Sequence, residues 1–307
     1  MTTPPSSSSP AVTTTPDVTA EMLRNSRRLT RSNRLFTAAF VVIGGTYVVL
    51  IILLLAADAA FMVTESTGDH TSYTGRFFSL ENPLLLAAAD PNIRHAIVLS
   101  LISCTLSAIA SLSVAIPLGF VMSRWAFPGR QLVDAILDIP IALPPLVIGL
   151  SLLILFQFRP FAWLSRDIVY QVPAVIIAQF SVACAFAVRA MKSTFDQIDP
   201  RCEQVAITLG CSRLQAFGYV VLPEATRGLV TAFTLAWARS LGEFGPLLVF
   251  AGATRMKTEV LSTSVFLELN VGNLGGAVAV SLIMVMAALI VLIITRLAGN
   301  RSVTDVT

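Results

Sequence analysis

Residues Glu203–Pro223 read EQVAITLGCSRLQAFGYVVLP, and this stretch carries the densest helix signals outside the apolar segments of the chain. Just before it, Asp199 can N-cap a helix in which Pro200 takes the first position. Gly210 supplies a left-handed C-cap, and Ser212 can cap a second helix directly after it. The pattern therefore predicts two short helices joined by a tight glycine turn. Such a protruding knob is suited to binding a partner protein.

Composition predicts that the rest of the chain lies in a membrane. The sequence is 55% hydrophobic and 13% charged, with a mean hydropathy of +0.78, which excludes an ordinary soluble domain. Six long apolar segments each reach the roughly 20 residues that a helix needs to cross about 30 Å of hydrocarbon. We therefore expect an all-α integral membrane protein with six transmembrane helices. The predicted spans are Leu35–Ala57, His95–Ser123, Ile139–Phe158, Ile168–Val188, Gly228–Ala253 and Val271–Thr295.

The distribution of Lys and Arg predicts the orientation of these spans. The segments on the N-terminal side hold 14 of them: Arg24, Arg27, Arg28, Arg31, Arg34, Arg124, Arg130, Arg189, Lys192, Arg201, Arg213, Arg227, Arg296 and Arg301. The opposite side holds six: Arg76, Arg94, Arg159, Arg166, Arg255 and Lys257. By the positive-inside rule, the N- and C-termini and the Glu203–Pro223 loop are predicted to be cytoplasmic. The net charge of +3 follows from this topology and does not indicate a nucleic-acid partner.

Four regions are expected along the chain. Residues 1–34 form a cytoplasmic tail whose Ser-, Thr- and Pro-rich part is predicted to be disordered. Its basic end, Glu21–Arg34, is expected to lie against the lipid headgroups. Residues 35–94 supply the first transmembrane helix and an external loop. Residues 95–299 form the core domain, and residues 300–307 form a short cytoplasmic tail.

The sequence contains no pattern that indicates covalent catalysis, a metal site or a cofactor. Neither lysine follows a Gly-x-x-x-x-Gly run, so the chain has no phosphate-binding loop, and any ATP must be bound by another chain. Cys202 and Cys211 lack metal-ligand spacing, and His70 and His95 are isolated. We expect packing or surface roles for all four residues.

The third predicted span contains a helix-breaking sequence. Residues Asp138–Gly149 read DIPIALPPLVIG, in which Pro144 and Pro145 each remove a backbone donor and clash with the preceding turn. In lipid the freed carbonyl groups need partners, which confines the break to a protein-lined or water-lined site. One interpretation is a gating element beside a translocation pathway that includes Gly149. The other is a helix that begins only at Pro144, with residues 137–143 as a lead-in.

Two charges lie well inside the fifth predicted span. Arg239 and Glu243 would each cost roughly 2.5–3.5 kcal/mol at mid-bilayer if they faced lipid unpaired. Their i,i+4 spacing places them on one face, where they can pair with each other. This face either lines a pathway or subunit seam or holds a purely structural ion pair. Gly242 and Gly245 beside the pair permit close helix contact or a local break.

The predicted knob resembles the EAA loop of ABC importer permeases, in which Gly is followed by nine residues and a hydrophobic-x-Leu-Pro ending. The sequence fits this spacing at Gly210, Val220, Leu222 and Pro223. The Glu-Ala-Ala of the family aligns with Gln204, Val205 and Ala206, of which only Ala206 matches, and Glu203 stands one position early. The resemblance implies that the knob docks on an ATPase subunit.

Two further segments are similar to the molybdate and sulfate branch of these permeases. ARSLGEFGPLLVFAG, Ala238–Gly252, resembles its Ala-Arg-Ala-hydrophobic-Gly-Glu-Phe/Tyr-Gly pattern, and Leu143–Gly149 resembles its Leu-Pro-Pro run. The resemblance implies a type I importer fold and a homodimer that carries no enzymatic activity of its own. It also implies two ATPase subunits and a periplasmic or lipid-anchored binding protein. The implied cargo is a tetrahedral oxyanion that crosses the bacterial inner membrane, molybdate first, then sulfate or tungstate.

Two alternatives remain open from the residues. The chain could be an ABC permease for another solute, such as phosphate. It could also be a channel or secondary carrier that uses Arg239 and Glu243 as ion or proton sites. The second alternative explains the intramembrane charges but does not explain the capped knob.

Overall fold

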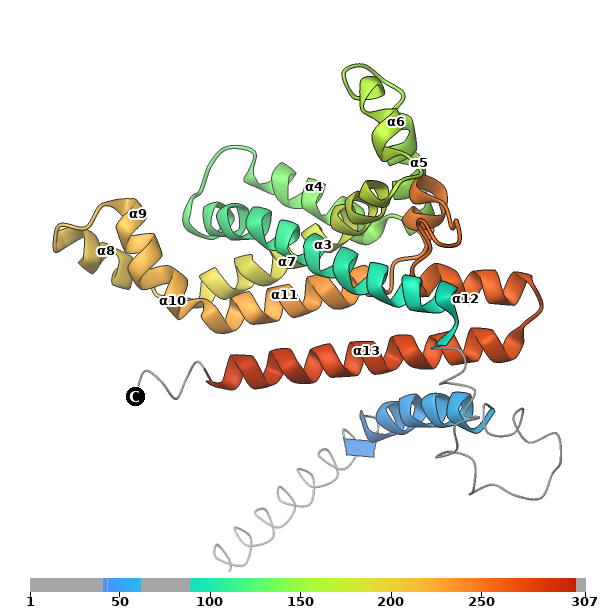
Figure 1. Ribbon diagram of the computed structural model, residues 1–307. Coiled ribbons are helices and arrows are strands. Elements are labelled where there is room, and N and C mark those ends of the chain that lie inside the picture. The colour runs from blue at the N-terminus through green and yellow to red at the C-terminus, as the bar shows by residue number, and fades with distance from the viewer. Residues whose placement is uncertain (1–40, 43, 62–88, 302–307) are drawn as a thin grey trace, which may run out of the picture. The chain divides into compact units, whose positions relative to one another are not determined.

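The computed structural model describes residues 41–42, 44–61 and 89–301, with side chains up to Leu297. Every regular element in these residues is a helix (Figure 1). The chain divides into two units, Met1–Ala59 and Ala60–Thr307, and each is described by itself. The predicted 1–34 tail, most of the predicted external loop, including His70, and residues 302–307 lie outside the described residues.

One apolar helix, Gly44–Phe61, lies almost wholly in the first unit. It has 18 residues and a mean hydropathy of 2.0. At 1.5 Å per residue it extends about 27 Å, close to the thickness of the hydrocarbon layer. It corresponds to the predicted span Leu35–Ala57.

The second unit combines long α-helices with short helical segments. In chain order the elements are α3 (Pro91–Arg124), α4 (Arg130–Ala142), α5 (Pro145–Leu155), η1 (Phe161–Trp163), α6 (Ser165–Ile168), α7 (Val172–Gln197), α8 (Pro200–Thr208), α9 (Arg213–Ala216), η2 (Phe217–Val221), α10 (Leu222–Glu224), α11 (Thr226–Leu241), η3 (Leu247–Ala251), α12 (Leu261–Asn270) and α13 (Leu274–Arg301). The segments η2 and η3 are π-helical. In the second unit, α3, α7 and α13 are long and apolar enough to cross a membrane, and they correspond to the second, fourth and sixth predicted spans.

The third predicted span, Ile139–Phe158, is not a straight helix. α4 ends at Ala142, and α5 begins at Pro145 after a bend of 110°. Pro144 is extended, with φ −56° and ψ 131°, and serves as the N-cap of α5. Proline is tolerated at a helix start, where no backbone donor is needed. The structure therefore has the helix beginning at the proline pair, and the lead-in is itself a helix of 13 residues.

The predicted span Gly228–Ala253 is not a single helix, and the local break that Gly242 and Gly245 permit is present. α11 has 16 residues and ends at Leu241, with Gly242 as its C-cap. The chain becomes helical again only after Pro246, as the π-helix η3. Pro246 lacks the backbone N–H that would continue the α11 ladder, and Gly242 and Gly245 weaken helix formation on either side of Glu243.

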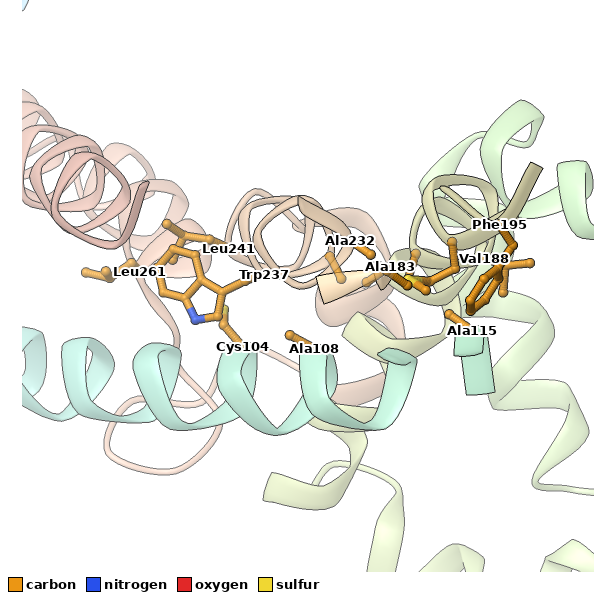
Figure 2. Packing of buried hydrophobic residues seen from close by; sticks show 14 of the residues in the cluster. Cys104, Ala108, Ala115, Ala183, Val188, Phe195, Ala232, Trp237, Leu241 and Leu261 are labelled. Atoms are coloured by element: carbon orange, nitrogen blue, oxygen red, sulfur yellow. The ribbon is translucent and has the colours of Figure 1, made fainter. Parts of the chain in front are cut away.

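The core of the second unit lies among α3, α7 and α11 (Figure 2). Its α3 and α7 faces are built largely from Ala and Ser, which allow helix backbones to approach closely in a membrane protein. Trp237 of α11 is the largest fully buried side chain in the described residues, and its indole N–H donates to Thr105 Oγ1 at 3.2 Å. The bundle is therefore joined by close backbone approach and one large aromatic anchor.

Candidate functional site

Residues 199–224 form the structure that the sequence predicted between α7 and α11, and we call them the knob. The side chain of Asp199 accepts from the backbone N–H two residues further on, at 2.9 Å. Gly210 has a φ of +97°, the left-handed conformation that a C-cap requires. Ser212 N donates to Gln215 Oε1 at 2.9 Å, and Gln215 N donates to Ser212 Oγ at 3.3 Å. These contacts confirm the predicted caps and the glycine turn.

The knob exposes large apolar side chains. The exposed fractions are 56% for Val205, 81% for Leu209, 81% for Leu214 and 77% for Tyr219. Large apolar side chains that a protruding element exposes are candidates for contact with a partner. The sequence reasoning named none of the four as a contact, although Val205 and Leu209 are spaced i,i+4 on one face of α8 and its C-cap.

The predicted docking residues differ in where the structure places them. Gln204, Gly210, Ser212 and Pro223 are exposed, Leu222 is half-buried, and Ala206 is buried. Glu203 is also half-buried, and its Oε2 lies 3.8 Å from Nε of Arg124 at the end of α3. The carboxylate of Glu203 therefore faces the body of the protein.

The two interrupted segments of the predicted pathway pack against each other. Gly149 of α5 faces Pro246, such that a Cβ at Gly149 would lie 2.7 Å from Pro246 Cα. Gly245 in turn faces the start of α5, where a Cβ would lie 2.9 Å from Leu146 N and 3.1 Å from the carbonyl carbon of Pro145. Because Gly149 and Gly245 have no side chains, the start of α5 can pack closely against the segment between α11 and η3. Pro145 takes part in this contact, and both Pro144 and Pro145 remain largely exposed.

Arg239 and Glu243 form the predicted ion pair. The Glu243 side chain is 1% exposed, whereas that of Arg239 is 28% exposed. The Arg239 guanidinium also lies over the Phe186 ring of α7, 5.4 Å from its centroid. Ser262 Oγ donates to the backbone carbonyl oxygen of Glu243 at 2.6 Å, which holds the chain after the end of α11. The pair therefore presents a partly accessible cation and a hidden carboxylate.

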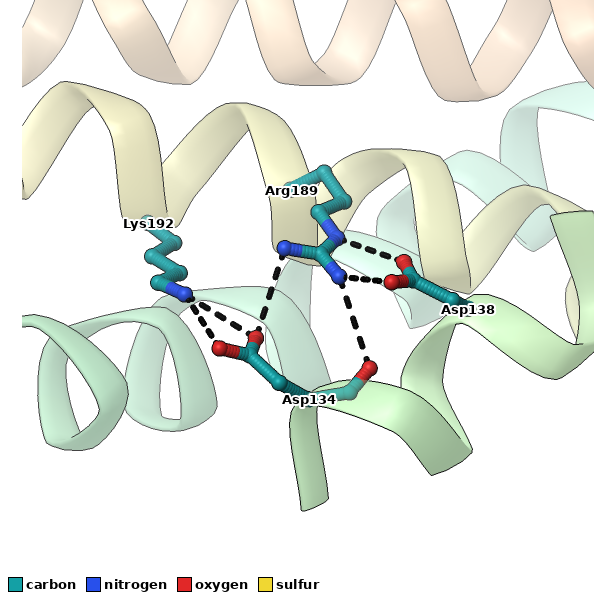
Figure 3. A network of polar contacts seen from close by, with 4 residues as sticks. All are labelled: Asp134, Asp138, Arg189 and Lys192. Carbon is teal, nitrogen blue, oxygen red and sulfur yellow. Dashed lines mark hydrogen bonds and ion pairs between the residues drawn. The ribbon is translucent and has the colours of Figure 1, made fainter. Parts of the chain in front are cut away.

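A second group of charges joins α4 to α7 (Figure 3). Lys192 Nζ donates to both carboxylate oxygens of Asp134, at 2.9 and 2.7 Å. Arg189 Nε donates to Asp138 Oδ1 at 2.8 Å, and Arg189 Nη1 lies 3.3 Å from Asp134 Oδ1. Sequence reasoning missed this network, although the i,i+4 acids and the i,i+3 bases were visible as matching faces. The two acids and two bases of the network have no net charge. Because α4 has no buried residues, this network is a main link between α4 and α7.

Helices of membrane-spanning length, a capped knob and two apposed helix breaks together define a multi-pass membrane protein. Residues 115–302 match the family of binding-protein-dependent transport system inner membrane components. The match covers more than half of the chain, so the protein belongs to this family of ABC transporter permease subunits. It is accordingly a transport component and not an enzyme.

Several characterised permeases are similar to this chain. The sulfate transport system permease protein CysT of Escherichia coli is 34% identical over 208 residues, which cover 66% of this chain and 75% of CysT. The molybdate/tungstate transport system permease protein WtpB of Pyrococcus abyssi is 36% identical over 162 residues, or 53% of this chain and 62% of WtpB. The molybdenum transport system permease protein ModB of Escherichia coli is 30% identical over 209 residues, or 66% of this chain and 91% of ModB.

Solved structures share the fold. A chain from the bacterial alginate ABC transporter, crystallised with an alginate pentasaccharide-bound periplasmic protein, superimposes with a TM-score of 0.64. The superposition covers 90% of this chain and 96% of that chain at 15% identity. At this identity the likeness establishes the ABC importer permease architecture only.

Proposed function

We propose that this chain is the membrane-spanning subunit of an ATP-driven importer for a tetrahedral oxyanion. The observation that carries the proposal is the similarity, at 30–36% identity, to permeases named for sulfate and for molybdate or tungstate. These relatives divide between the two groups of anions. The proposed cargo is therefore the class that they share, with molybdate, sulfate and tungstate as its members.

In this proposal the knob is the docking element for an ATPase subunit. Its exposed Leu209, Leu214 and Tyr219 supply apolar surface that a cleft in the partner would cover. ATP-driven closure of two ATPases would draw two knobs together and swing the attached helices from an inward-facing to an outward-facing arrangement. In this proposal the helices of this chain line the pathway and change conformation, and ATP hydrolysis by the ATPase supplies the energy.

The accessible cation of the Arg239–Glu243 pair favours an anion as the cargo. A hydrated anion that enters this region meets the 28%-exposed Arg239 side chain, whereas the carboxylate beside it is 1% exposed. A carrier of metal cations would need the carboxylate to be the accessible partner. We propose that the route lies beside the contact between α5 and the α11–η3 break, where both spans are interrupted and Gly149 and Gly245 allow a close approach.

The proposed assembly is a homodimer in the bacterial inner membrane, with two ATPases on one side and a periplasmic or lipid-anchored binding protein on the other. The knob and the C-terminal end of α13 lie at the same end of the second unit (Figure 1). This arrangement supports the cytoplasmic location that the Lys and Arg distribution predicts for both.

Reconstitution in liposomes tests the proposal. The chain, co-expressed with its ATPase, is incorporated into vesicles, and the binding protein is added outside with radiolabelled molybdate, sulfate or phosphate. We expect uptake of one of the first two anions that depends on both ATP and the binding protein. Uptake without ATP would indicate a channel or carrier. ATP-dependent uptake of phosphate alone would support an ATP-driven importer but refute the proposed cargo.

A further inference from the structure

Arg124 is the last residue of α3, and its side chain is almost wholly buried. The exposed fraction of the side chain is 9%. Its Nη2 donates to the backbone carbonyl oxygen of Ile198 at 3.0 Å, and its Nε lies 3.8 Å from Glu203 Oε2. A buried guanidinium is costly in free energy unless its partners are well placed. The partners here belong to two different elements, the end of α7 and the first turn of α8.

The position of these partners matters because the chain bends between them. Ile198 and Asp199 join α7 to α8 and are both extended, with ψ of 126° and 121°. The covalent connection is therefore a two-residue turn and not a continuous helix. A force applied to α8 would rotate it about this turn unless a side chain bridged it. Arg124 bridges it from the α3 side.

An aromatic contact supports the same junction one turn earlier in α3. The Phe120 ring packs edge-on against Phe217 of η2, with centroids 4.7 Å apart, and against Phe195 of α7, at 5.5 Å. The last turn of α3 thus touches the end of α7 and both halves of the knob. The aromatic contact is apolar. Arg124 adds a directional hydrogen bond to Ile198 and an ion pair with Glu203.

We infer that Arg124 is a positioning residue for energy coupling, which fixes the knob to α3 and α7 so that the three move as one body. The inference rests on the proposed function, because it takes the knob to be where the ATPase acts. Without the bridge, motion of the knob would be absorbed by the turn at Ile198–Asp199. ATP would then be hydrolysed with less movement of the membrane helices.

The test measures the anion transported per ATP hydrolysed in the reconstituted complex. We expect Arg124→Gln to remain bound to its ATPase subunit through purification but to transport severalfold less anion per ATP hydrolysed. Glu203→Gln leaves the bond to Ile198 intact but removes the ion pair between Arg124 and the knob, so it should also lower the ratio. Arg124→Lys keeps the charge beside Glu203 and should restore much of the ratio. The matched control is Arg227→Gln, which removes an exposed arginine just beyond the knob.

An unchanged ratio in Arg124→Gln, equal to that of Arg227→Gln, overturns the inference. If Arg124→Gln does not assemble, a normal ratio in Glu203→Gln overturns the inference as well, because that variant removes the contact between Arg124 and the knob.

A distance measurement on the chain alone separates this inference from the proposed function. Spin labels are placed at Ser113 of α3 and at Arg213 of the knob, in a background with Cys202 and Cys211 replaced by serine. We expect a narrow distance distribution that broadens in Arg124→Gln, whether or not an ATPase binds. If the unmodified chain does not bind an ATPase, the proposed function is refuted. If the distance distribution of Arg124→Gln is as narrow as that of the unmodified chain, the positioning role of Arg124 is refuted.

Discussion

Adding one methyl group at Gly245 should separate the two interrupted helices. In Gly245→Ala the new Cβ would lie 2.9 Å from Leu146 N, 3.1 Å from the carbonyl carbon of Pro145 and 3.1 Å from its Cβ. Carbon atoms in contact are ordinarily about 3.5–4.0 Å apart, so the start of α5 must move away by roughly 0.6 Å. Two of the three opposing atoms are backbone, which cannot turn aside as a flexible side chain can.

The expected cost follows from this overlap. Overpacking of a close contact typically costs about 1–3 kcal/mol. Replacing glycine by alanine recovers about 0.4–1 kcal/mol by restricting the unfolded chain. We therefore expect Gly245→Ala to lose about 1–2 kcal/mol of stability. Gly149→Ala, whose Cβ would lie 2.7 Å from Pro246 Cα, should lose at least as much. The double variant should lose less than the sum, because the first substitution already opens the shared contact.

Gly242→Ala is the matched control. It changes the same kind of residue three positions away, where the nearest atoms to a new Cβ are 3.9 Å distant and φ is −81°. Thermal unfolding of the purified proteins in detergent measures all four variants against the unmodified chain. Gly242→Ala should unfold at or slightly above the normal temperature. If Gly245→Ala unfolds at the same temperature as Gly242→Ala, the close packing of α5 against the segment between α11 and η3 is refuted.

Three further results are expected from particular residues. Glu243→Gln alone should lower stability, by less than the roughly 3–5 kcal/mol of a fully buried pair, because Arg239 loses its partner but is 28% exposed. The double variant Arg239→Gln, Glu243→Gln should unfold at a higher temperature than the single variant, and equal midpoints would mean that the two residues do not pair. Gly210→Val forces a β-branched residue to a φ of +97° and should cost about 1–3 kcal/mol locally. We expect the variant to insert into the membrane but to hydrolyse ATP without coupled uptake, and normal uptake per ATP would exclude the knob as the docking element. An impermeant thiol reagent added to intact cells should label Lys257→Cys but not the exposed native Cys202, which should react only after permeabilisation; the reverse pattern would overturn the predicted topology.

Local features of this protein were predictable because their physics is confined to neighbouring residues. The caps of the knob close within three residues, as in the reciprocal bonds of Ser212 and Gln215. The φ of Gly210 follows from the cost of the left-handed conformation for other residues. The pairing of Arg239 with Glu243 follows from helical spacing and the cost of a lone charge in lipid. The number of apolar segments follows from composition and length.

The helix breaks were only partly predictable. The proline pair at Pro144 and Pro145 indicated an interruption, but the 110° bend depends on where α4 and α5 find contacts. The end of α11 at Gly242 was one of two alternatives that the sequence left open, because glycine is also common in continuous membrane helices. What ends the helix in the structure is support from elsewhere, including the bond from Ser262 to the carbonyl oxygen of Glu243 and the packing of Gly245 on α5.

Only the tertiary structure decided which distant residues meet. Arg124 and Ile198 are 74 positions apart, and Lys192 and Asp134 are 58 apart. Each contact requires that two helices be rotated about their own axes so that the right faces oppose each other. That rotation is set by packing over the whole of α3, α7 and α11, where small residues allow several close approaches. Spacing along one helix places a side chain on a face, but it does not state what the face will touch.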